Sequence, residues 1–391
     1  MPRDVVTLLT NAFRPDPRAL SQARGLAESG FRVTLVSWDR EGAFPAAESR
    51  DGFDVIRVQE VRSTYAAGWR QMFRLPRFWR RAVGIARQLE PAIFQARDLD
   101  TLPAGWWLKS RVGGKLVYDA AEHYPALMSL YLPRVMVKAL VLLERALIRK
   151  ADVVLTASTV LRDEYLARGI RPVVALGNYP DLSPYARVTE AQAEGLRSEL
   201  RLAPEDLLVV YVGGFSRNRE LLPLIQAAAL LPEVQVHLWG DGPQRLAVEQ
   251  AVAQQPNARY HGWLASADLP LYFKAADIIY YCLRLDYPGA VYNAPNTLTQ
   301  AMAASRPIVA NDVGDLGRMV RATQCGVLID QATPQAIAEA VEQLRDPTVR
   351  AQLGANGIQA ATGLYNMDVT RRQLVEIYQE LFKQEPDLCI S

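Results

Sequence analysis

The chain alternates short, continuously apolar runs with longer stretches in which apolar residues recur at helical spacing. Continuous apolar runs are typical of parallel strands that helices cover on both faces. Strand and helix patterns that alternate in this way favour a doubly wound α/β architecture. The predicted strands are residues 5–9, 33–37, 55–58, 92–95, 116–118 and 153–156, and, after a break, 207–212, 234–239, 278–282, 308–310 and 327–329.

Breaker residues separate the two sets of predicted strands around residues 177–202. This segment contains Pro180, Ser183 and Pro184, and clusters of this kind are typical of an interdomain linker. A chain of 391 residues is also too long for one ordinary core. The sequence therefore predicts two Rossmann-like domains, with a cleft between them at the carboxyl ends of both sheets.

Charge and cysteine content exclude several classes of protein. The formal net charge of +2 argues against a nucleic-acid binder, because such proteins usually concentrate a strong basic excess on one face. Cys282, Cys325 and Cys389 lie too far apart for a disulfide framework or a zinc site. The start lacks the apolar region of a signal peptide, and no stretch reaches the roughly 18 apolar residues of a spanning helix. We therefore expect reduced thiols in a cytoplasmic protein.

The motifs of the commoner α/β enzymes are absent from the sequence. Residues 10–15, which follow the first predicted strand, do not read Gly-x-Gly-x-x-Gly, which argues against a dinucleotide-dependent dehydrogenase. The sequence has no Walker A loop and no Gly-x-Ser-x-Gly elbow, so P-loop NTPases and α/β-hydrolases are not expected. None of the three histidines has a partner at metal-ligand spacing, so no metal site is predicted.

Residues 292–310 carry more functional information than any other segment. They predict a loop, then a short helix opened by Pro295, then a buried strand. A proline fits the first turn of a helix, where its missing N–H would be unsatisfied anyway. The free N–H groups at such a helix start form a ready anion-binding site.

This segment resembles the donor-binding signature of family 4 glycosyltransferases, which attach sugars from nucleotide-sugar donors. Further stretches resemble the same family in the same order along the chain, namely residues 14–18, 116–125, 211–219, 239–243 and 261–263. The resemblance implies a GT-B fold: an acceptor domain at residues 1–178, a donor domain at 179–364, and a final helix within 365–391 that crosses back to the first domain. It also implies a retaining, metal-independent transfer of a hexose from a nucleotide-diphosphate sugar to a glycolipid or polysaccharide acceptor, without a cofactor.

The resemblance also implies which residues bind the donor. Arg219 follows a glycine-rich turn where the family usually has a phosphate-binding lysine or arginine, and its fork of donors would clamp the diphosphate. A solvated loop arginine is the alternative, and Arg217 could serve instead. Asn296, Thr297 and Leu298 would present backbone amides to the diphosphate, and Thr297 also a hydroxyl, unless they form only an ordinary helix cap. The other implied donor contacts are Gly214, Gly240, Trp263 and Gln300.

The chain departs from the family pattern at the donor segment. Gln300 stands where a glutamate usually binds the ribose, and its carboxamide keeps a carbonyl acceptor. Tyr292 stands where another glutamate usually touches the transferred sugar. Its ring can contact a sugar but carries no negative charge; the alternative is a loop aromatic that fills the domain interface. Thr297 replaces a common lysine.

Candidate catalytic residues are Glu122, His123 and Tyr292. The family pattern has histidine just before the glutamate, whereas here Ala121 precedes it and the histidine follows. His123 would orient the sugar or handle a proton, or else be structural. The predicted acceptor contacts are Arg18, Asp98 and Asp119, of which the two aspartates alternatively cap helices. The departures leave two other functions open: a GT-B protein that binds a nucleotide sugar without turnover, and a GT-B sugar-nucleotide epimerase.

Residues 62–87 form a basic stretch without any acidic residue. Interleaved arginines and aromatics are typical of an interfacial helix that anionic head groups attract. We therefore expect a protein that is peripheral on the inner face of the membrane, the alternative being a solvated arginine face backed by core aromatics. The stretch contains Arg62, Arg70, Arg74, Arg77, Arg80, Arg81 and Arg87 with Trp69, Phe73, Phe78 and Trp79. Additional basic residues surround the apolar run 135–147, namely Arg134, Lys138, Arg145, Arg149 and Lys150.

Overall fold

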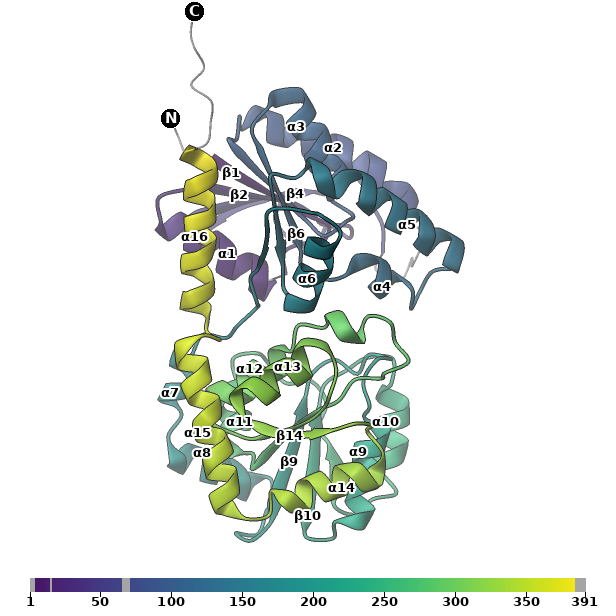
Figure 1. The fold of residues 1–391 in the computed structure, drawn as a ribbon, viewed down its shortest axis with the longest axis vertical. Coiled ribbons are helices and arrows are strands. Elements are labelled where there is room, and N and C mark those ends of the chain that lie inside the picture. The colour runs from purple at the N-terminus through teal and green to yellow at the C-terminus, as the bar shows by residue number, and fades with distance from the viewer. Residues whose placement is uncertain (1–3, 15, 65–70, 384–391) are drawn as a thin grey trace, which may run out of the picture. The chain divides into compact units, whose positions relative to one another are not determined.

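The computed structural model describes residues 4–14, 16–64 and 71–383, and the chain divides into two compact units (Figure 1). Unit 1 consists of Met1–Asn178 together with Asp368–Ser391, and unit 2 is Tyr179–Met367. Predictions that concern Pro15, Trp69, Arg70 and Cys389 lie outside the described residues. Each unit holds one sheet of mainly parallel strands flanked by helices, which confirms the α/β architecture.

Unit 1 contains an eight-stranded sheet in the order β3-β4-β2-β1-β5-β6-β7-β8. Only the β3–β4 pair is antiparallel among its described strands. The strand order changes direction between β1 and β5, so the loops that follow these two strands border the crevice where open sheets bind ligands. The strands are β1 Asp4–Leu9, β2 Arg32–Trp38, β3 Ala47–Arg50, β4 Phe53–Val58, β5 Ile93–Arg97, β6 Lys115–Ala120, β7 Val153–Thr156 and β8 Val173–Ala175.

Helices cover both faces of this sheet, and alternate side chains of the strands show which helix lies on which face. Val33 of β2 packs into the core cluster of α1 and α16, whereas Trp38 stacks on Phe78 of α2 with ring centroids 5.1 Å apart. On β6, Asp119 contacts α1 and Tyr118 contacts α5. Helices α2 and α5 therefore share one face of the sheet. The helices are α1 Pro17–Glu28, α2 Leu75–Gln88, α3 Leu102–Val112, α4 Tyr124–Met128, α5 Arg134–Leu147, α6 Thr159–Ala167 and α16 Met367–Lys383, with the 3-10 helix η2 Ile148–Lys150.

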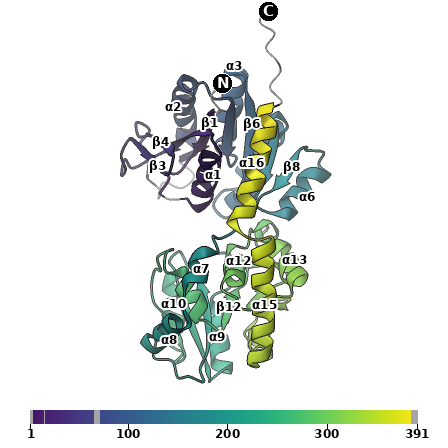
Figure 2. The same cartoon turned by 90° about the vertical axis from the view of Figure 1, so that its left-hand side faces the viewer.

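The last helix, α16, lies beside α1 although the two are about 350 residues apart in the chain (Figure 2). Leu374, Tyr378 and Leu381 belong to the same buried cluster as Leu26 of α1. The Tyr378 hydroxyl also donates to Gln95 Oε1 of β5 over 2.6 Å. The final helical segment is thus part of the core of unit 1.

Unit 2 contains a six-stranded parallel sheet in the order β11-β10-β9-β12-β13-β14, which changes direction between β9 and β12. The strands are β9 Leu207–Val212, β10 Val234–Trp239, β11 Ala258–Tyr260, β12 Ile278–Tyr281, β13 Ile308–Asn311 and β14 Gly326–Ile329. The helices are α7 Ser183–Arg187, α8 Glu190–Glu199, α9 Leu222–Ala227, α10 Arg245–Val252, α11 Leu269–Ala275, α12 Asn296–Ala303, α13 Gly314–Thr323, α14 Pro334–Gln343 and α15 Pro347–Gly363, with the 3-10 helices η3 Ala228–Leu230 and η4 Ala290–Tyr292.

The predicted linker at residues 177–202 is only partly a linker. Its polar helical stretch is α8, which a reciprocal capping box between Thr189 and Gln192 opens. Leu196 of α8 packs against Ala275 of α11, so this stretch belongs to unit 2. The division between the units lies directly after Asn178.

Candidate functional site

Two loops meet at the point where the strand order of unit 2 changes direction. The loop after β9 carries Arg219, and the loop after β12 begins at Cys282. Arg219 and Leu283 form an isolated antiparallel bridge that ties these loops together. Asn311 of β13 holds the second loop as well, because its side chain bonds both the N–H and the C=O of Leu283. In open α/β sheets this is where ligands bind.

The glycine turns after β9 and β10 pack directly on each other. Gly213 donates its N–H to the carbonyl oxygen of Trp239 over 3.0 Å. Gly240 has φ +154°, and a Cβ at this residue would lie 1.9 Å from the carbonyl oxygen of Gly213. Only glycine fits at position 240, because any side chain would collide with the turn after β9. Gly214 is exposed at the tip of that turn.

Arg219 is half-buried and lies against aromatic side chains. Its guanidinium carbon is 4.8 Å from the centroid of the Tyr281 ring, and the Tyr281 hydroxyl donates to Asn293 Oδ1 over 2.9 Å. This chain of contacts connects the loop after β9 with the segment before α12. Gln244 fixes the backbone below, since its Nε2 donates to the carbonyl oxygens of Ser216 (2.5 Å) and Arg219 (3.0 Å). Arg217, by contrast, is exposed.

Helix α12 starts at Asn296 with Pro295 at the N-cap, and no side chain caps it. The first-turn amides therefore have no side-chain partner and can bind an anion. Asn296 is exposed, whereas Thr297 and Leu298 are buried. Gln300 lies one turn after Asn296 on the same face of the helix and is half-buried.

Tyr292 ends the short η4 helix, and its N–H donates to the carbonyl oxygen of Gly289 over 3.1 Å. The preceding residue packs on the start of α13. A Cβ on Gly314, which has φ +52°, would lie 2.1 Å from the carbonyl oxygen of Val291. Tyr292 is half-buried on this closely packed turn of unit 2.

An aromatic stack supports the loop that carries Trp263. His261 lies parallel to Trp239, with ring centroids 4.4 Å apart and an interplanar angle of 10°. The N–H of Gly240 donates to the carbonyl oxygen of Gly262 over 2.8 Å. Trp263 follows this anchored pair and is 72% exposed, so it is available to a ligand.

His237 lies beneath this stack and predicts an acid-sensitive unit 2. Burial, together with the neighbouring His261 and Arg259, lowers the pKa of His237 to about 3. The unfolded chain takes up this proton near pH 6.5, so stability is full above that pH and is lost as the pH falls toward 3. Lowering the pH from 8 to 5 therefore reduces the free energy of unfolding by about 2 kcal/mol. We expect His237→Phe to reduce the fall in melting temperature over this range, and an identical fall in both proteins would contradict the assignment.

In unit 1, two aspartates lie at the switch point between β1 and β5. Thr10 Oγ1 donates to Asp100 Oδ2 over 2.6 Å, and burial raises the pKa of Asp100 to about 6. Asp98 has φ +59°, and burial likewise raises the pKa of its carboxyl well above the usual value. The backbone N–H of Glu122 donates to Asp98 Oδ1 over 3.2 Å, so the structure brings these two predicted site residues together.

His123 caps the short helix α4. Its Nδ1 accepts a hydrogen bond from the N–H of Ala126 over 3.1 Å, and burial lowers the pKa of the ring. A neutral ring that accepts at Nδ1 carries its proton on Nε2. One nitrogen therefore has a structural role, and only Nε2 remains for the predicted catalytic role.

Arg18 and Asp119 do not fit their predicted contact with acceptor hydroxyls. Both side chains are buried and form a bidentate pair, Nε–Oδ2 at 3.1 Å and Nη2–Oδ1 at 2.6 Å. Although burial acts to raise it, the Arg18 charge holds the pKa of Asp119 below its usual value. Arg18 also donates to the carbonyl oxygen of Leu176 over 2.6 Å. Because neither side chain reaches the surface, we assign both to the core of unit 1.

The aromatic residues of α2 also differ from the predicted interfacial arrangement. Phe78 is fully buried, and Trp79 Nε1 donates to the carbonyl oxygen of Asp100 over 2.7 Å. The exposed residues of α2 are mainly arginines, and three of them, Arg77, Arg80 and Arg81, line a hollow of about 630 Å³. Phe73, which precedes α2, is 71% exposed, so the described part of the predicted patch combines an arginine face with one exposed aromatic side chain.

Two family models match the chain. Residues 206–346 match the glycosyl transferases group 1 model, and residues 15–178 match the glycosyl transferase 4-like domain. The chain belongs to the group 1 glycosyltransferases.

Relatives of this glycosyltransferase have varied names. The alpha-D-kanosaminyltransferase of Streptomyces kanamyceticus is 25% identical over 61% of this chain and 63% of its own length. The alpha-maltose-1-phosphate synthase of Mycolicibacterium smegmatis is 26% identical over 61% of this chain and 65% of its own length. The lipopolysaccharide core biosynthesis glycosyltransferase LpsE of Rhizobium meliloti is 24% identical over 49% of this chain and 54% of its own length. The chain thus spans between about half and two thirds of the length of these relatives.

Solved structures confirm the GT-B fold of this glycosyltransferase. A sucrose-phosphate synthase from Thermosynechococcus elongatus aligns with a TM-score of 0.82 at 21% identity, covering 98% of this chain and 100% of the other. HepE of Anabaena, solved with UDP and glucose, aligns with a TM-score of 0.75 at 17% identity, covering 96% of this chain and 99% of the other. WaaG, a glycosyltransferase involved in lipopolysaccharide biosynthesis, aligns with a TM-score of 0.72 at 16% identity, covering 95% of this chain and 99% of the other.

Several residues that build the site of this glycosyltransferase were missed by sequence reasoning. Arg219 and its loop are held by Tyr281, Asn293 and Gln244. In unit 1, Asp100 lies beside the predicted Asp98 at the switch point and accepts a hydrogen bond from Thr10. Asp100 follows a predicted strand as Asp98 does, so the same signal could have identified it. The other three are ordinary strand-end or turn residues whose partners lie far away in the chain.

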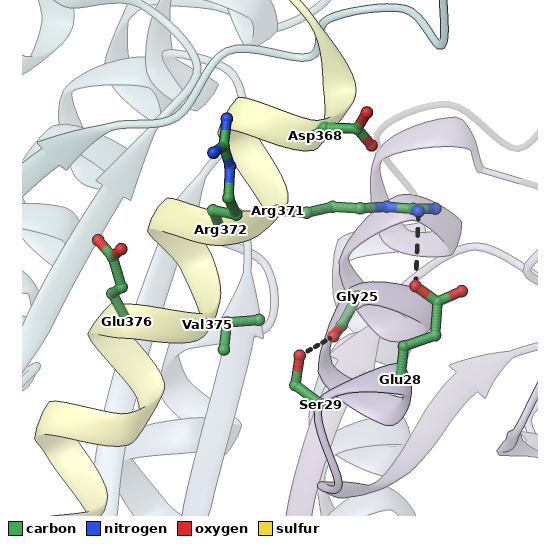
Figure 3. A pocket seen from close by; sticks show the side chains of 8 residues that line it. All are labelled: Gly25, Glu28, Ser29, Asp368, Arg371, Arg372, Val375 and Glu376. Carbon is green, nitrogen blue, oxygen red and sulfur yellow. Dashed lines mark hydrogen bonds and ion pairs between the residues drawn. The ribbon is translucent and has the colours of Figure 1, made fainter. Parts of the chain in front are cut away.

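One further hollow, of about 340 Å³, lies between α1 and α16 of unit 1 (Figure 3). Arg371 reaches across it toward α1, and its Nη1 is 3.7 Å from Glu28 Oε2. Gly25 allows this approach, since a Cβ there would lie 3.0 Å from Arg371 Cγ. None of the predicted site residues lines this hollow.

Within the described ranges, no group of three or more His, Cys, Asp or Glu side chains could hold a metal ion. No helix in the part of the chain that the structure describes combines the length and apolar character needed to cross a membrane.

Proposed function

We propose that this chain is a retaining, metal-independent glycosyltransferase that moves a hexose from a nucleotide-diphosphate sugar to a glycolipid or polysaccharide acceptor. The observation that carries the proposal is that Arg219, on the loop after β9, and the uncapped start of α12 both follow strands at the switch point of unit 2. Tyr281 and Asn293 connect the two, so both belong to one packed site.

The charge of a leaving diphosphate would be balanced by groups of this chain. Arg219 offers a fork of donors, and the amides of Thr297 and Leu298 lie at the positive end of a helix dipole. Such fixed donors stabilise charge as it develops on a leaving group. Gln300, one turn further along the same helix face, would accept a hydrogen bond from the ribose.

The sugar-transfer step would use the remaining candidates. Glu122 and the Nε2 of His123 are the proposed polar groups near the sugar, and Tyr292 would contact its ring. Asp98, which the backbone of Glu122 positions, is the proposed contact with an acceptor hydroxyl. Burial raises the pKa of its carboxyl well above the usual value, which favours the protonated form that can donate to such a hydroxyl.

The names of similar proteins suggest which substrates to test first. HepE was solved with UDP and with UDP-glucose, so UDP is our first choice of donor base. LpsE and WaaG are named for lipopolysaccharide biosynthesis, which supports a glycan acceptor linked to lipid. We further propose that the protein is cytoplasmic and peripheral on the inner face of the membrane, where the arginines of α2 would meet anionic head groups.

Tyr292 favours one alternative, a protein that binds the nucleotide sugar without turnover. A phenol offers no negative charge to an oxocarbenium-like centre, whereas the amides and Arg219 suffice for binding. An epimerase of the same fold would instead change the sugar nucleotide at a ring carbon without any acceptor.

Thermal-shift titration with UDP, GDP, ADP and their sugars tests the donor half of the proposal. A ligand held at a hundred times its dissociation constant adds about 2.7 kcal/mol of stability. A scan for hydrolysis or transfer of the same sugars tests the chemical half. If no nucleotide raises the melting temperature, donor binding is refuted; binding without any turnover across donors and lipid acceptors would favour the alternative.

A further inference from the structure

Helix α5 turns an apolar stripe to the surface of unit 1. Val135 and Leu142 are 79% and 64% exposed. Ala139 and Ala146 are also exposed, and spacings of four, three and four residues place all four side chains on one face of the helix. We call these four residues the α5 stripe. Tyr131, just before the helix, is 59% exposed and extends it.

Buried side chains on the inner face of α5 fix the orientation of the helix. Leu140 and Leu147 are buried against the unit. Glu144 is buried between them and accepts hydrogen bonds from the hydroxyls of Tyr118 (3.1 Å) and Tyr165 (2.8 Å). The α5 stripe therefore cannot rotate inward without breaking a buried polar cluster, and the one acidic side chain of the helix points away from the surface.

Basic side chains border the α5 stripe along one side. Arg134, Lys138 and Arg145 are exposed, and spacings of four and seven residues align them beside the stripe. Arg149 and Lys150 continue the exposed basic border into η2. Except for buried Glu144, residues 131–150 contain no acidic residue that would offset this charge.

An apolar stripe with a basic border matches an anionic bilayer better than it matches a second copy of this chain. A symmetric dimer on this face would bring identical basic borders together, which costs electrostatic energy. Helix α2, whose exposed arginines carry further positive charge, covers the same face of the sheet as α5, with α3 packed against both (Figure 1). Apolar side chains beside a polybasic surface are the features of interfacial membrane helices.

We propose that α5 inserts its stripe at the acyl boundary of an anionic bilayer, while α2 contributes charge alone. Phe78 is buried and the Trp79 indole bonds the backbone of Asp100, so Val135 and Leu142 of α5 are the inserting side chains, to which Phe73, 71% exposed before α2, would add. The role of this contact rests on the proposed function, because it would bring unit 1 to a lipid-linked acceptor.

Vesicle sedimentation tests the proposal with phosphatidylcholine vesicles that contain or lack phosphatidylglycerol. The protein is expected to bind the anionic vesicles, more weakly as NaCl is raised. The double variant Val135→Gln, Leu142→Gln is expected to bind them about tenfold more weakly, because it loses apolar burial but no charge. The triple variant Arg77→Gln, Arg80→Gln, Arg81→Gln should instead flatten the salt dependence. Leu246→Gln is the matched control, since Leu246 is 66% exposed on α10 of unit 2, and its binding should not change.

Three outcomes would overturn the insertion of α5. The first is a double variant that binds anionic vesicles as tightly as the parent. The second is a loss of vesicle binding in Leu246→Gln as large as that in the double variant. The third is a dimer, seen by light scattering, that the double variant converts to monomer. UDP thermal shifts on the same proteins keep the proposals separate. A variant that loses vesicle binding but keeps the circular dichroism spectrum and the urea midpoint of the parent is folded and supports insertion. A parent that binds vesicles but shows no shift with UDP, GDP, ADP or their sugars refutes donor binding and leaves the α5 result intact.

Discussion

Replacing Arg219 with alanine is expected to remove between half and most of the thermal stabilisation that a bound nucleotide diphosphate gives. The guanidinium would make charge-assisted hydrogen bonds to the diphosphate, and such bonds contribute about 1.5–3 kcal/mol each. The dissociation constant should therefore rise about 10- to 100-fold. At a ligand concentration a hundred times the parent's dissociation constant, the stabilisation should then fall from about 2.7 kcal/mol to between about 1.4 and 0.4 kcal/mol. Titration of the melting temperature with UDP, or with the base that binds best, measures the effect.

Arg217→Ala is the matched control for this prediction. Arg217 lies on the same loop but is exposed, whereas Arg219 stacks on Tyr281 and is tied by its backbone to Leu283. We expect Arg217→Ala to keep most of the shift. Arg219→Lys should give an intermediate loss, because lysine keeps the charge but not the planar fork. An unchanged shift in Arg219→Ala, or a shift lost only in Arg217→Ala, would reject Arg219 as the clamp.

Replacing Arg18 with methionine is expected to lower the free energy of unfolding of unit 1 by about 3–5 kcal/mol. Methionine preserves most of the volume but leaves the Asp119 carboxylate buried without its bidentate partner. Gln22 and Gln95 would still donate to the carboxylate, but neither carries a charge. Urea denaturation followed by circular dichroism should show the loss as a lower midpoint.

Arg24→Met on the same helix provides the control. Arg24 pairs with Asp51, and both side chains are partly exposed, so its loss should destabilise the protein much less than the loss of Arg18. The double variant Arg18→Met, Asp119→Leu should recover much of the lost stability, because it removes the unpaired buried charge. The assignment fails if Arg18→Met is no more destabilising than Arg24→Met.

The sequence was sufficient to predict the strands that form the centre of each sheet. Strands such as β9 and β10 are continuous apolar runs, and the predicted and observed bounds agree at residues 207–212 and 234–239. Three peripheral strands were missed. β3 (Ala47–Arg50) is a polar antiparallel edge without a buried face, and β8 and β11 have only three residues each. Such strands carry too little apolar signal to stand out from loops.

The donor half of the site was easier to predict than the acceptor half. Arg219 and residues 296–298 lie in contiguous motifs, so their neighbourhood is visible in the sequence. Arg18 and Asp119 are 101 residues apart, and nothing local shows that they neutralise each other in the core. Periodicity likewise predicted an amphipathic α2 but not which of its faces is buried, since arginines and aromatics both recur there at helical spacing.

The return of the chain to unit 1 through α16 determines the order in which the units are completed. Unit 2 is one uninterrupted segment, Tyr179–Met367, so a fragment of those residues would contain the whole donor half for nucleotide binding. A fragment that ends at Asn178 would lack the Tyr378 hydroxyl that Gln95 binds and the apolar cover of Leu374 and Leu381. During synthesis, the unit that begins first can therefore close its core only after the last helix has left the ribosome, when unit 2 is already complete.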